Sequence, residues 1–150
     1  PAIARAAAAA RTAAAPAAPC VGAGEHILLV EDDDIMRDLL CEVLGEAGYA
    51  VHAAGDPEEA LALARDAADA IDLVVTDVVM PKMNGFQLAR DLRVRHPGAR
   101  VLYMSGYTDR MLADRGDFRD DDPFLRKPFS NDALLAKVRE ALDAPPRALD

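Results

Sequence analysis

Short apolar runs alternate with amphipathic segments from Glu25 onward, and this alternation restricts the possible folds more than any other feature. Five of the runs are predicted strands because they are short, apolar and bounded by turn signals: His26–Val30, Tyr49–Ala53, Asp72–Thr76, Val101–Met104 and Pro123–Lys127. Strands that alternate with helices are joined by right-handed crossovers, which give a parallel sheet. The sequence therefore predicts an α/β fold with a single doubly wound, five-stranded parallel sheet and helices on both faces.

Helices are predicted between these strands and after the last one. The first carries apolar residues at helical spacing from Ile35 to Leu44 and is expected to stop at Gly45 and Gly48. Four further helical segments are predicted: Asp56 to Ala70, Gly85–Arg95, a short helix over Thr108–Arg115, and a last helix from its cap Ser130 to Leu142. Residues 116–122 are predicted to form a charged loop.

Residues 1–24 differ in composition from the rest of the chain. They are rich in Ala and Pro, contain no acidic residue and have almost no large apolar side chain. Such a segment buries too little surface to offset the entropy lost on ordering, so we expect a disordered linker. We expect one folded domain over residues 25–143 and a C-terminal tail over residues 144–150. Because the first residue is Pro rather than Met, we also expect a piece of a longer protein.

Charge and cysteine content restrict the partners and the compartment. The formal net charge of −9 argues against direct nucleic acid binding, since phosphate contacts need a clustered positive surface. No apolar run reaches about 18 residues, so no membrane contact by this domain is expected. Cys20 and Cys41 fit no metal-binding spacing and are interpreted as free thiols in a reducing compartment. We expect a cytoplasmic location, although a longer parent protein could be anchored in a membrane. The oligomeric state is left open.

Polar residues stand where the predicted strands end. Glu31 and Asp32 follow the first strand, Asp77 the third, Ser105 the fourth, and Lys127 ends the fifth. Because the carboxyl ends of parallel strands meet at one edge of a sheet, these five side chains should converge on one crevice.

Three converging carboxylates require a compensating cation. Two unit charges about 4 Å apart repel by roughly 4 kcal/mol at an effective dielectric of 20. An all-oxygen ligand set favours a hard ion, Mg²⁺ first and Mn²⁺ second. A carboxylate beside such an ion, with Lys127 and Ser105 available for phosphate oxygens, is arranged to be phosphorylated.

Four motifs in this order and spacing resemble the receiver domain of two-component response regulators: ILLVEDD, DLVVTDVVMPKMNG, VLYMSG and FLRKPF. The resemblance covers about residues 25–143. It implies the flavodoxin-like strand order 2-1-3-4-5. It also implies a domain that accepts a phosphoryl group and switches conformation, rather than an enzyme that turns substrate over.

The resemblance assigns the metal and phosphate ligands. Asp77 would be the phosphoacceptor and also a metal ligand, and Asp32 would be a direct Mg²⁺ ligand. Glu31 would be the second acidic position, often acting through water, where an Asp is commoner in the family. The backbone carbonyl of Val79 would be a further metal contact.

The remaining family positions concern the response to phosphorylation. Ser105 would bond the phosphoryl group and Lys127 would pair with it. Phe124 falls where the family has a Tyr or Phe that turns inward once Ser105 moves. The bond between Lys127 and Pro128 falls where the family has a cis peptide, which proline tolerates. The segment between Ser105 and Phe124 is richer in Arg and Asp than the usual fourth helix, so the length of that helix is left open.

The phosphodonor must come from another domain or protein, because His26, His52 and His96 are scattered along the sequence. The expected partner is a histidine kinase or a histidine phosphotransfer domain. Residues 105–109, Ser-Gly-Tyr-Thr-Asp, resemble receivers at the C-terminus of hybrid sensor histidine kinases. We favour that origin over a stand-alone single-domain response regulator.

Two competing functions fit the residues less well. An aspartate-nucleophile phosphatase of the haloacid dehalogenase kind also uses a strand-end Asp and Mg²⁺, but its chemistry needs a second Asp where Val79 stands. A receiver-like interaction module that is never phosphorylated usually lacks the equivalent of Asp77, Asp32 or Lys127, and this chain has all three.

Overall fold

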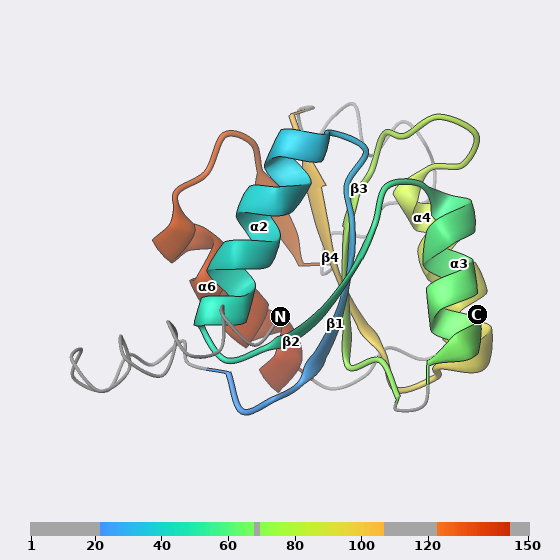
Figure 1. Cartoon of the computed structure of the whole chain (residues 1–150), viewed down its shortest axis with the longest axis horizontal. Coiled ribbons are helices and arrows are strands. Elements are labelled where there is room, and N and C mark those ends of the chain that lie inside the picture. Colours follow the sequence, from blue (N-terminus) through green and yellow to red (C-terminus); the bar gives the residue numbers. More distant parts are fainter. Residues whose placement is uncertain (1–21, 68–69, 107–122, 145–150) are drawn as a thin grey trace.

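The computed structural model describes residues 22–67, 70–106 and 123–144, and their strands form one parallel sheet (Figure 1). The strands are β1 (His26–Val30), β2 (Ala50–Ala54), β3 (Leu73–Asp77), β4 (Arg100–Ser105) and β5 (Phe124–Arg126). The helices in the described residues are α2 (Asp34–Glu46), α3 (Pro57–Asp66), α4 (Gly85–Arg95) and α6 (Asn131–Asp143). All strand pairs are parallel, in the order β2-β1-β3-β4-β5. The predicted fold class and strand order are confirmed.

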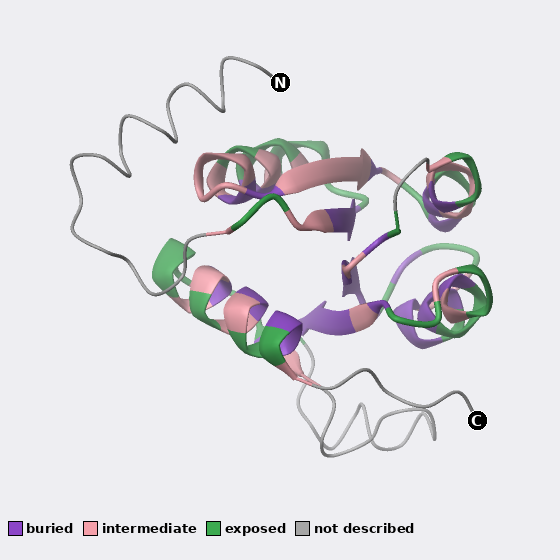
Figure 2. Cartoon of the chain, turned by 90° about the horizontal axis from the view of Figure 1, so that it is seen from below, coloured by how far each residue is buried: buried purple, intermediate pink, exposed green. Residues whose placement is uncertain are grey.

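Helices cover both faces of the sheet because successive residues of each strand point to opposite sides. In β1, Ile27 and Leu29 pack with α2 and α6, whereas Leu28 and Val30 pack with α3 and α4. Figure 2 shows the buried residues of the helices on the sides turned toward the sheet. The two apolar cores that result hold the central strands rigidly and fix where their carboxyl ends lie.

Each described helix begins with a side-chain cap directly after a strand or a short loop. The capping side chains are those of Asp33, Asp56, Asn84 and Ser130, and each accepts a hydrogen bond from the backbone N–H three residues on. Such a cap satisfies one of the donors that a helix N-terminus leaves free. Capped helices therefore begin a few residues after Glu31, Asp32 and Lys127.

Helix ends differ from their predicted positions at two places. Helix α2 continues through Gly45 to Glu46, and the chain turns instead at Gly48, which has φ of 102°. Helix α3 ends at Asp66 rather than Ala70. The imidazole of His96 accepts a hydrogen bond from the Ile71 N–H and lies 2.8 Å from the Ala64 carbonyl oxygen, so the chain leaves α3 early to enter β3.

The predicted bounds of β1 are confirmed, and those of the other strands differ from the prediction by one residue at each end, so that β5 is shorter than expected. The predicted helix over Thr108–Arg115, the charged loop over residues 116–122 and most of the predicted linker and tail lie outside the described residues.

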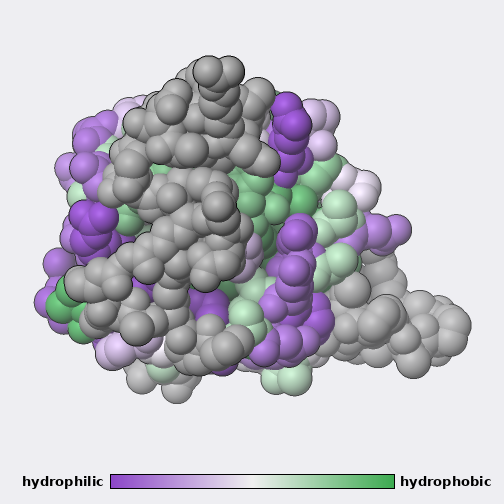
Figure 3. Space-filling view, turned by 180° about the vertical axis from the view of Figure 1, so that it is seen from behind, coloured by the Kyte–Doolittle hydropathy of each residue, from purple (hydrophilic) through white to green (hydrophobic). Residues whose placement is uncertain are grey.

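The apolar stripe predicted for the first helix is only partly buried. Leu40 and Leu44 face the core, whereas Ile35 is 83% exposed and Leu39 47% exposed. Figure 3 shows the molecule from behind the view of Figure 1, and among the residues coloured there hydrophobic ones lie between hydrophilic ones.

Among the described residues, no helix is both long and apolar enough to cross a bilayer.

Gly85 is needed where α4 passes close to the end of β3. A Cβ built on Gly85 would collide with the backbone carbonyl oxygen of Asp77, and the Gly85 N–H donates to the Val78 carbonyl at 2.8 Å. The absence of a side chain therefore lets the loop after Asp77 fold back tightly onto α4. Gly98, in contrast, has open space around its Cα.

We expect Gly85→Ala to lower the free energy of unfolding by about 1–3 kcal/mol, because the new methyl group meets backbone that cannot move aside cheaply. Gly98→Ala is the matched control and should change it by less than about 0.5 kcal/mol. Urea denaturation followed by circular dichroism measures both. Equal effects of the two substitutions would show that the close approach at Gly85 does not matter.

Candidate functional site

The carboxyl ends of β1, β3, β4 and β5 bring the predicted site residues to one edge of the sheet. Glu31 and Asp32 follow β1 directly, Asp77 and Ser105 end β3 and β4, and Lys127 follows β5. The Lys127 N–H donates to the Ser105 carbonyl at 2.9 Å, which holds the start of the loop after β5 against β4. A cavity of about 110 Å³ opens here, lined by Asp32, Asp77, Val79, Met104, Ser105, Gly106 and Lys127.

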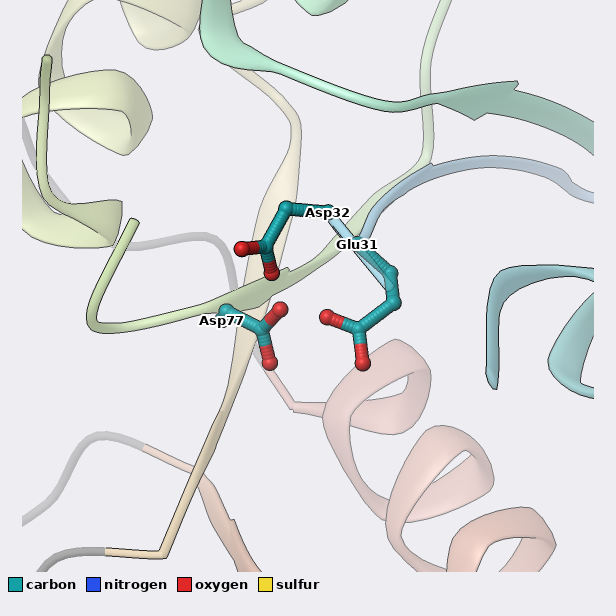
Figure 4. A group of neighbouring side chains, drawn as sticks. All are labelled: Glu31, Asp32 and Asp77. Atoms are coloured by element: carbon teal, nitrogen blue, oxygen red, sulfur yellow. The ribbon is translucent and has the colours of Figure 1, made fainter. Parts of the chain in front are cut away.

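Three carboxylates converge at this edge. Glu31, Asp32 and Asp77 each have an oxygen within 4.8 Å of the others, and their side chains point toward one another (Figure 4). Glu31 is 1% and Asp77 4% exposed, whereas Asp32 is exposed on the cavity rim. Water screens the first two poorly, so their mutual repulsion is stronger than at a surface.

Lys127 links two of the three acids. Its Nζ lies 2.6 Å from Asp77 Oδ1 and 2.8 Å from Glu31 Oε1. One ammonium thus joins the acid after β1 to the acid at the end of β3 across the sheet. Three carboxylates and a single ammonium still leave the cluster with an excess of negative charge.

The pKa of Asp77 is raised above its ordinary value, and burial of the carboxyl group is the main cause. The hydrogen bond and charge of Lys127 oppose this shift, as does the backbone N–H of Asp32. The effect of burial on the pKa of Asp77 thus outweighs that of the single nearby ammonium. The protein alone therefore does not fully compensate the charge of ionised Asp77.

The unsatisfied oxygens of the cluster fit a hard divalent cation. Glu31 Oε2 and Asp77 Oδ2 are buried and have no hydrogen-bond partner in the described part of the chain. A buried carboxylate oxygen without a partner is costly, and an ion such as Mg²⁺ would supply one. The donor set contains only oxygen, which suits Mg²⁺ or Mn²⁺ better than a softer metal.

Of the other predicted residues, Ser105 and Val79 line the cavity and Phe124 does not. Ser105 is 3% exposed and lines the cavity, and Val79 lines it from the loop after β3. Phe124 is half-buried in β5 and packs against the apolar core on the α3 and α4 side, away from the cavity wall. The Lys127–Pro128 peptide bond is cis.

Sequence reasoning missed the contact that Arg37 makes with this site. Arg37 lies in the first turns of α2 and its Nη1 donates to the backbone carbonyl of Glu31 at 2.8 Å. Its Nη2 lies 2.6 Å from Asp34 Oδ1. The sequence signals only the pairing with Asp34, since an Arg three residues after an acid at the start of a helix lies on the same side as that acid, and it does not signal the contact with the Glu31 carbonyl.

None of the three histidines lines the cavity. His26 Nδ1 and His52 Nε2 lie 3.0 Å apart near the start of β1, at the opposite end of the strands. His96 binds backbone groups between α3 and β3.

Comparison with known proteins identifies the family of this arrangement. The response regulator receiver domain family matches residues 27–139. The sensor kinase CckA of Brucella abortus is 39% identical over 117 residues, which are 78% of this chain and 12% of CckA. The response regulator receiver protein CpdR of the same organism is 33% identical over 120 residues, which are 80% of this chain and 98% of CpdR.

A solved structure agrees with this match. The receiver domain from the hybrid histidine kinase CckA superposes with a TM-score of 0.66 at 35% identity, covering 79% of this chain and 99% of that domain. The chain spans about half the length of the curated transcriptional regulators that it matches. The similarity therefore concerns one domain that occurs in proteins of different overall architecture.

We expect Asp77→Asn to raise the free energy of unfolding of the metal-free protein at pH 7 by about 1–2 kcal/mol, because it removes an under-compensated buried charge. A raised pKa means that the folded state binds more protons than the unfolded state, so ionisation of Asp77 costs stability as pH rises. The gain should therefore shrink as pH falls through the raised pKa toward the ordinary value of 3.8.

Urea denaturation in EDTA at pH 7, 6 and 5 measures this difference. Asp66→Asn, which changes an exposed acid on α3, is the control and should have little effect at any pH. A gain for Asp77→Asn that does not depend on pH would contradict the electrostatic explanation.

Proposed function

This chain belongs to the response regulator receiver family, and on that premise we propose that it accepts a phosphoryl group from a phosphohistidine onto Asp77 in a Mg²⁺-dependent reaction. Membership makes it a receiver domain of two-component signalling. The observation that carries the proposal is the convergence of Glu31, Asp32 and Asp77 with Lys127 bonded to Asp77 at one small cavity.

In the proposed reaction, a carboxylate oxygen of Asp77 forms a bond to phosphorus while the bond from phosphorus to the donor imidazole nitrogen breaks. The groups that would hold Mg²⁺ are Asp32, Asp77, Glu31 and the backbone carbonyl of Val79, with Glu31 acting in part through water. When bound, the ion would neutralise charge on the oxygens of the transferring phosphoryl group. The product is an aspartyl phosphate on the protein and a free histidine on the donor.

Lys127 and Ser105 are proposed to receive the phosphoryl oxygens. Lys127 already lies 2.6 Å from Asp77 Oδ1, so its ammonium can pair with the phosphoryl group with little movement. Ser105 lines the same cavity and its hydroxyl can donate to a phosphoryl oxygen. Both groups stabilise negative charge where it accumulates during transfer.

We further propose that phosphorylation switches the surface near Ser105 and Phe124. Movement of Ser105 toward the phosphoryl group would leave space into which the half-buried Phe124 can turn. Phe124 pairs in register with Tyr103, two residues before Ser105 in β4, so the two residues are close enough for such coupling. The domain would then act as a two-state switch rather than as a turnover enzyme.

A histidine kinase or a histidine phosphotransfer domain is the proposed donor, acting in the cytoplasm. We favour the receiver of a hybrid histidine kinase in a phosphorelay, supported by the similarity to the CckA receiver at 35% identity. A stand-alone single-domain regulator is the second candidate. It is supported by CpdR, because the matched segment makes up 98% of the length of CpdR. The sequence of the complete gene decides between them, because a kinase core encoded upstream supports the hybrid origin.

Incubation with acetyl phosphate and MgCl₂ should add one phosphoryl group to the full chain, measured by intact mass and by a phosphate-affinity gel. The modification should be absent in Asp77→Ala and in the presence of EDTA, because both the acceptor and the ion are required. Asp66→Ala, an exposed acid far from the cavity, should be modified as the wild type is. A wild type that stays unmodified, or a modification that persists in Asp77→Ala, would exclude the proposed acceptor.

Mg²⁺ alone should stabilise the protein against unfolding, because it would bind the folded carboxylate cluster and not the unfolded chain. At a concentration ten times its dissociation constant, the gain is about 1.4 kcal/mol. Thermal denaturation with increasing MgCl₂ measures the shift, which should be lost in Asp32→Ala and kept in Asp66→Ala. An equal shift in Asp32→Ala would mean that the ion binds elsewhere.

A further inference from the structure

The guanidinium of Arg37 contacts the backbone of the phosphoacceptor site rather than any of its carboxylates. Its Nη1 donates to the Glu31 carbonyl oxygen at 2.8 Å, and only 21% of its side chain is exposed. The Arg37 N–H donates in turn to the Asp33 carbonyl at 2.8 Å, within the first turn of α2. Arg37 therefore ties the start of α2 back to the acid-bearing loop that precedes it.

The contacted carbonyl belongs to the peptide unit that joins Glu31 to Asp32. A trans peptide is planar and its C=O and N–H point in opposite directions, so a cation on the Glu31 oxygen lies opposite the Asp32 N–H. The two residues that this peptide joins, Glu31 and Asp32, each place a carboxylate oxygen within 4.8 Å of Asp77 (Figure 4). One rigid unit thus carries both acids that face Asp77, with Arg37 bound to its carbonyl oxygen.

Neighbouring groups hold this arrangement in place. The Glu31 N–H donates to the Ala54 carbonyl at 3.1 Å, which fixes the preceding peptide on β2. Gly55 leaves space for the first guanidinium nitrogen, because a Cβ at Gly55 would lie 3.0 Å from Arg37 Nη1. The second guanidinium nitrogen pairs with Asp34, whose side chain is 84% exposed, so this ion pair is screened by water and contributes little to the position of Arg37.

We propose that Arg37 is a positioning residue for phosphoryl transfer, which holds the Glu31–Asp32 peptide so that the two acids keep their orientation toward Asp77. The inference rests on the proposed function for its catalytic consequence. A positive charge on the carbonyl oxygen polarises the peptide and strengthens its N–H as a donor. Arg37 does so without facing the cavity, since it is absent from the cavity wall.

The first test compares Arg37→Gln with Asp34→Asn in the full chain. Asp34→Asn removes the exposed partner of the guanidinium and leaves the bond to the Glu31 carbonyl. At saturating MgCl₂, we expect Arg37→Gln to lower the maximal rate of phosphorylation by acetyl phosphate about tenfold, the effect of weakening one hydrogen bond to a charged group. The acetyl phosphate concentration at half-maximal rate should not change, because Arg37 does not face the donor. Asp34→Asn should be phosphorylated like the wild type.

A second readout does not depend on phosphorylation. In ¹⁵N-HSQC spectra of the metal-free protein, the Asp32 amide proton should move upfield in Arg37→Gln, because the Glu31–Asp32 peptide loses the cation that polarises it, and much less in Asp34→Asn. Arg37→Lys keeps the charge and one donor, so its rate and amide shift should lie between those of the wild type and Arg37→Gln. Gly55→Ala crowds Nη1 by a contact of about 3.0 Å without altering α2, and it should lower the rate in the same direction, which keeps the test available if Arg37→Gln does not fold.

The outcomes separate the two proposals. A wild type that acetyl phosphate does not modify overturns the proposed function, while the Asp32 amide shift still judges the role of Arg37. An unchanged rate in both Arg37→Gln and Gly55→Ala overturns the positioning role, as does an Asp32 amide that does not move in Arg37→Gln. A loss in Asp34→Asn equal to that in Arg37→Gln overturns it too, because the exposed ion pair would then explain the effect.

Discussion

The bridge that Lys127 makes between Glu31 and Asp77 is the interaction on which the site depends. It joins the loop after β1 to the end of β3 and offsets part of the repulsion among three carboxylates that lie within 4.8 Å of one another. Without it, two buried acids would face each other with no opposite charge from the described part of the chain. Under the proposed function, the same ammonium would exchange one of these partners for the incoming phosphoryl group.

This bridge can form because the sheet is parallel. In the order β2-β1-β3-β4-β5, the central strands end at one edge. A side-chain cap at Asp33 starts α2 shortly after β1, and one at Asn84 starts α4 after the loop that follows β3. Gly85 permits the close return of α4 over the Asp77 carbonyl. Rigid cores on both faces therefore determine the positions of residues that contribute little to those cores themselves.

The buried carboxyl groups of the site lower the stability of the fold. Burial raises the pKa of Asp77, and buried oxygens of Glu31 and Asp77 have no hydrogen-bond partner among the described residues. Such under-compensated charge is typical of a site that binds a ligand, because the missing partners are supplied on binding. Arg37 contributes from outside the cavity, where its charge acts through a peptide group and does not neutralise the acids directly.

The sequence by itself determined the fold class and the set of residues at the strand ends. These residues are identified by the apolar runs that end in Glu31-Asp32, Asp77, Ser105 and Lys127. The alternation of strands and helices predicts parallel strands, whose carboxyl ends meet at one edge. It did not determine where α3 ends, because that end depends on a contact from His96. It also did not determine which apolar residues of α2 face outward. The contact of Arg37 with the Glu31 carbonyl was also decided only by the tertiary structure. These features depend on distances between segments far apart in the chain or on the direction of a single side chain, and local periodicity carries no information about either.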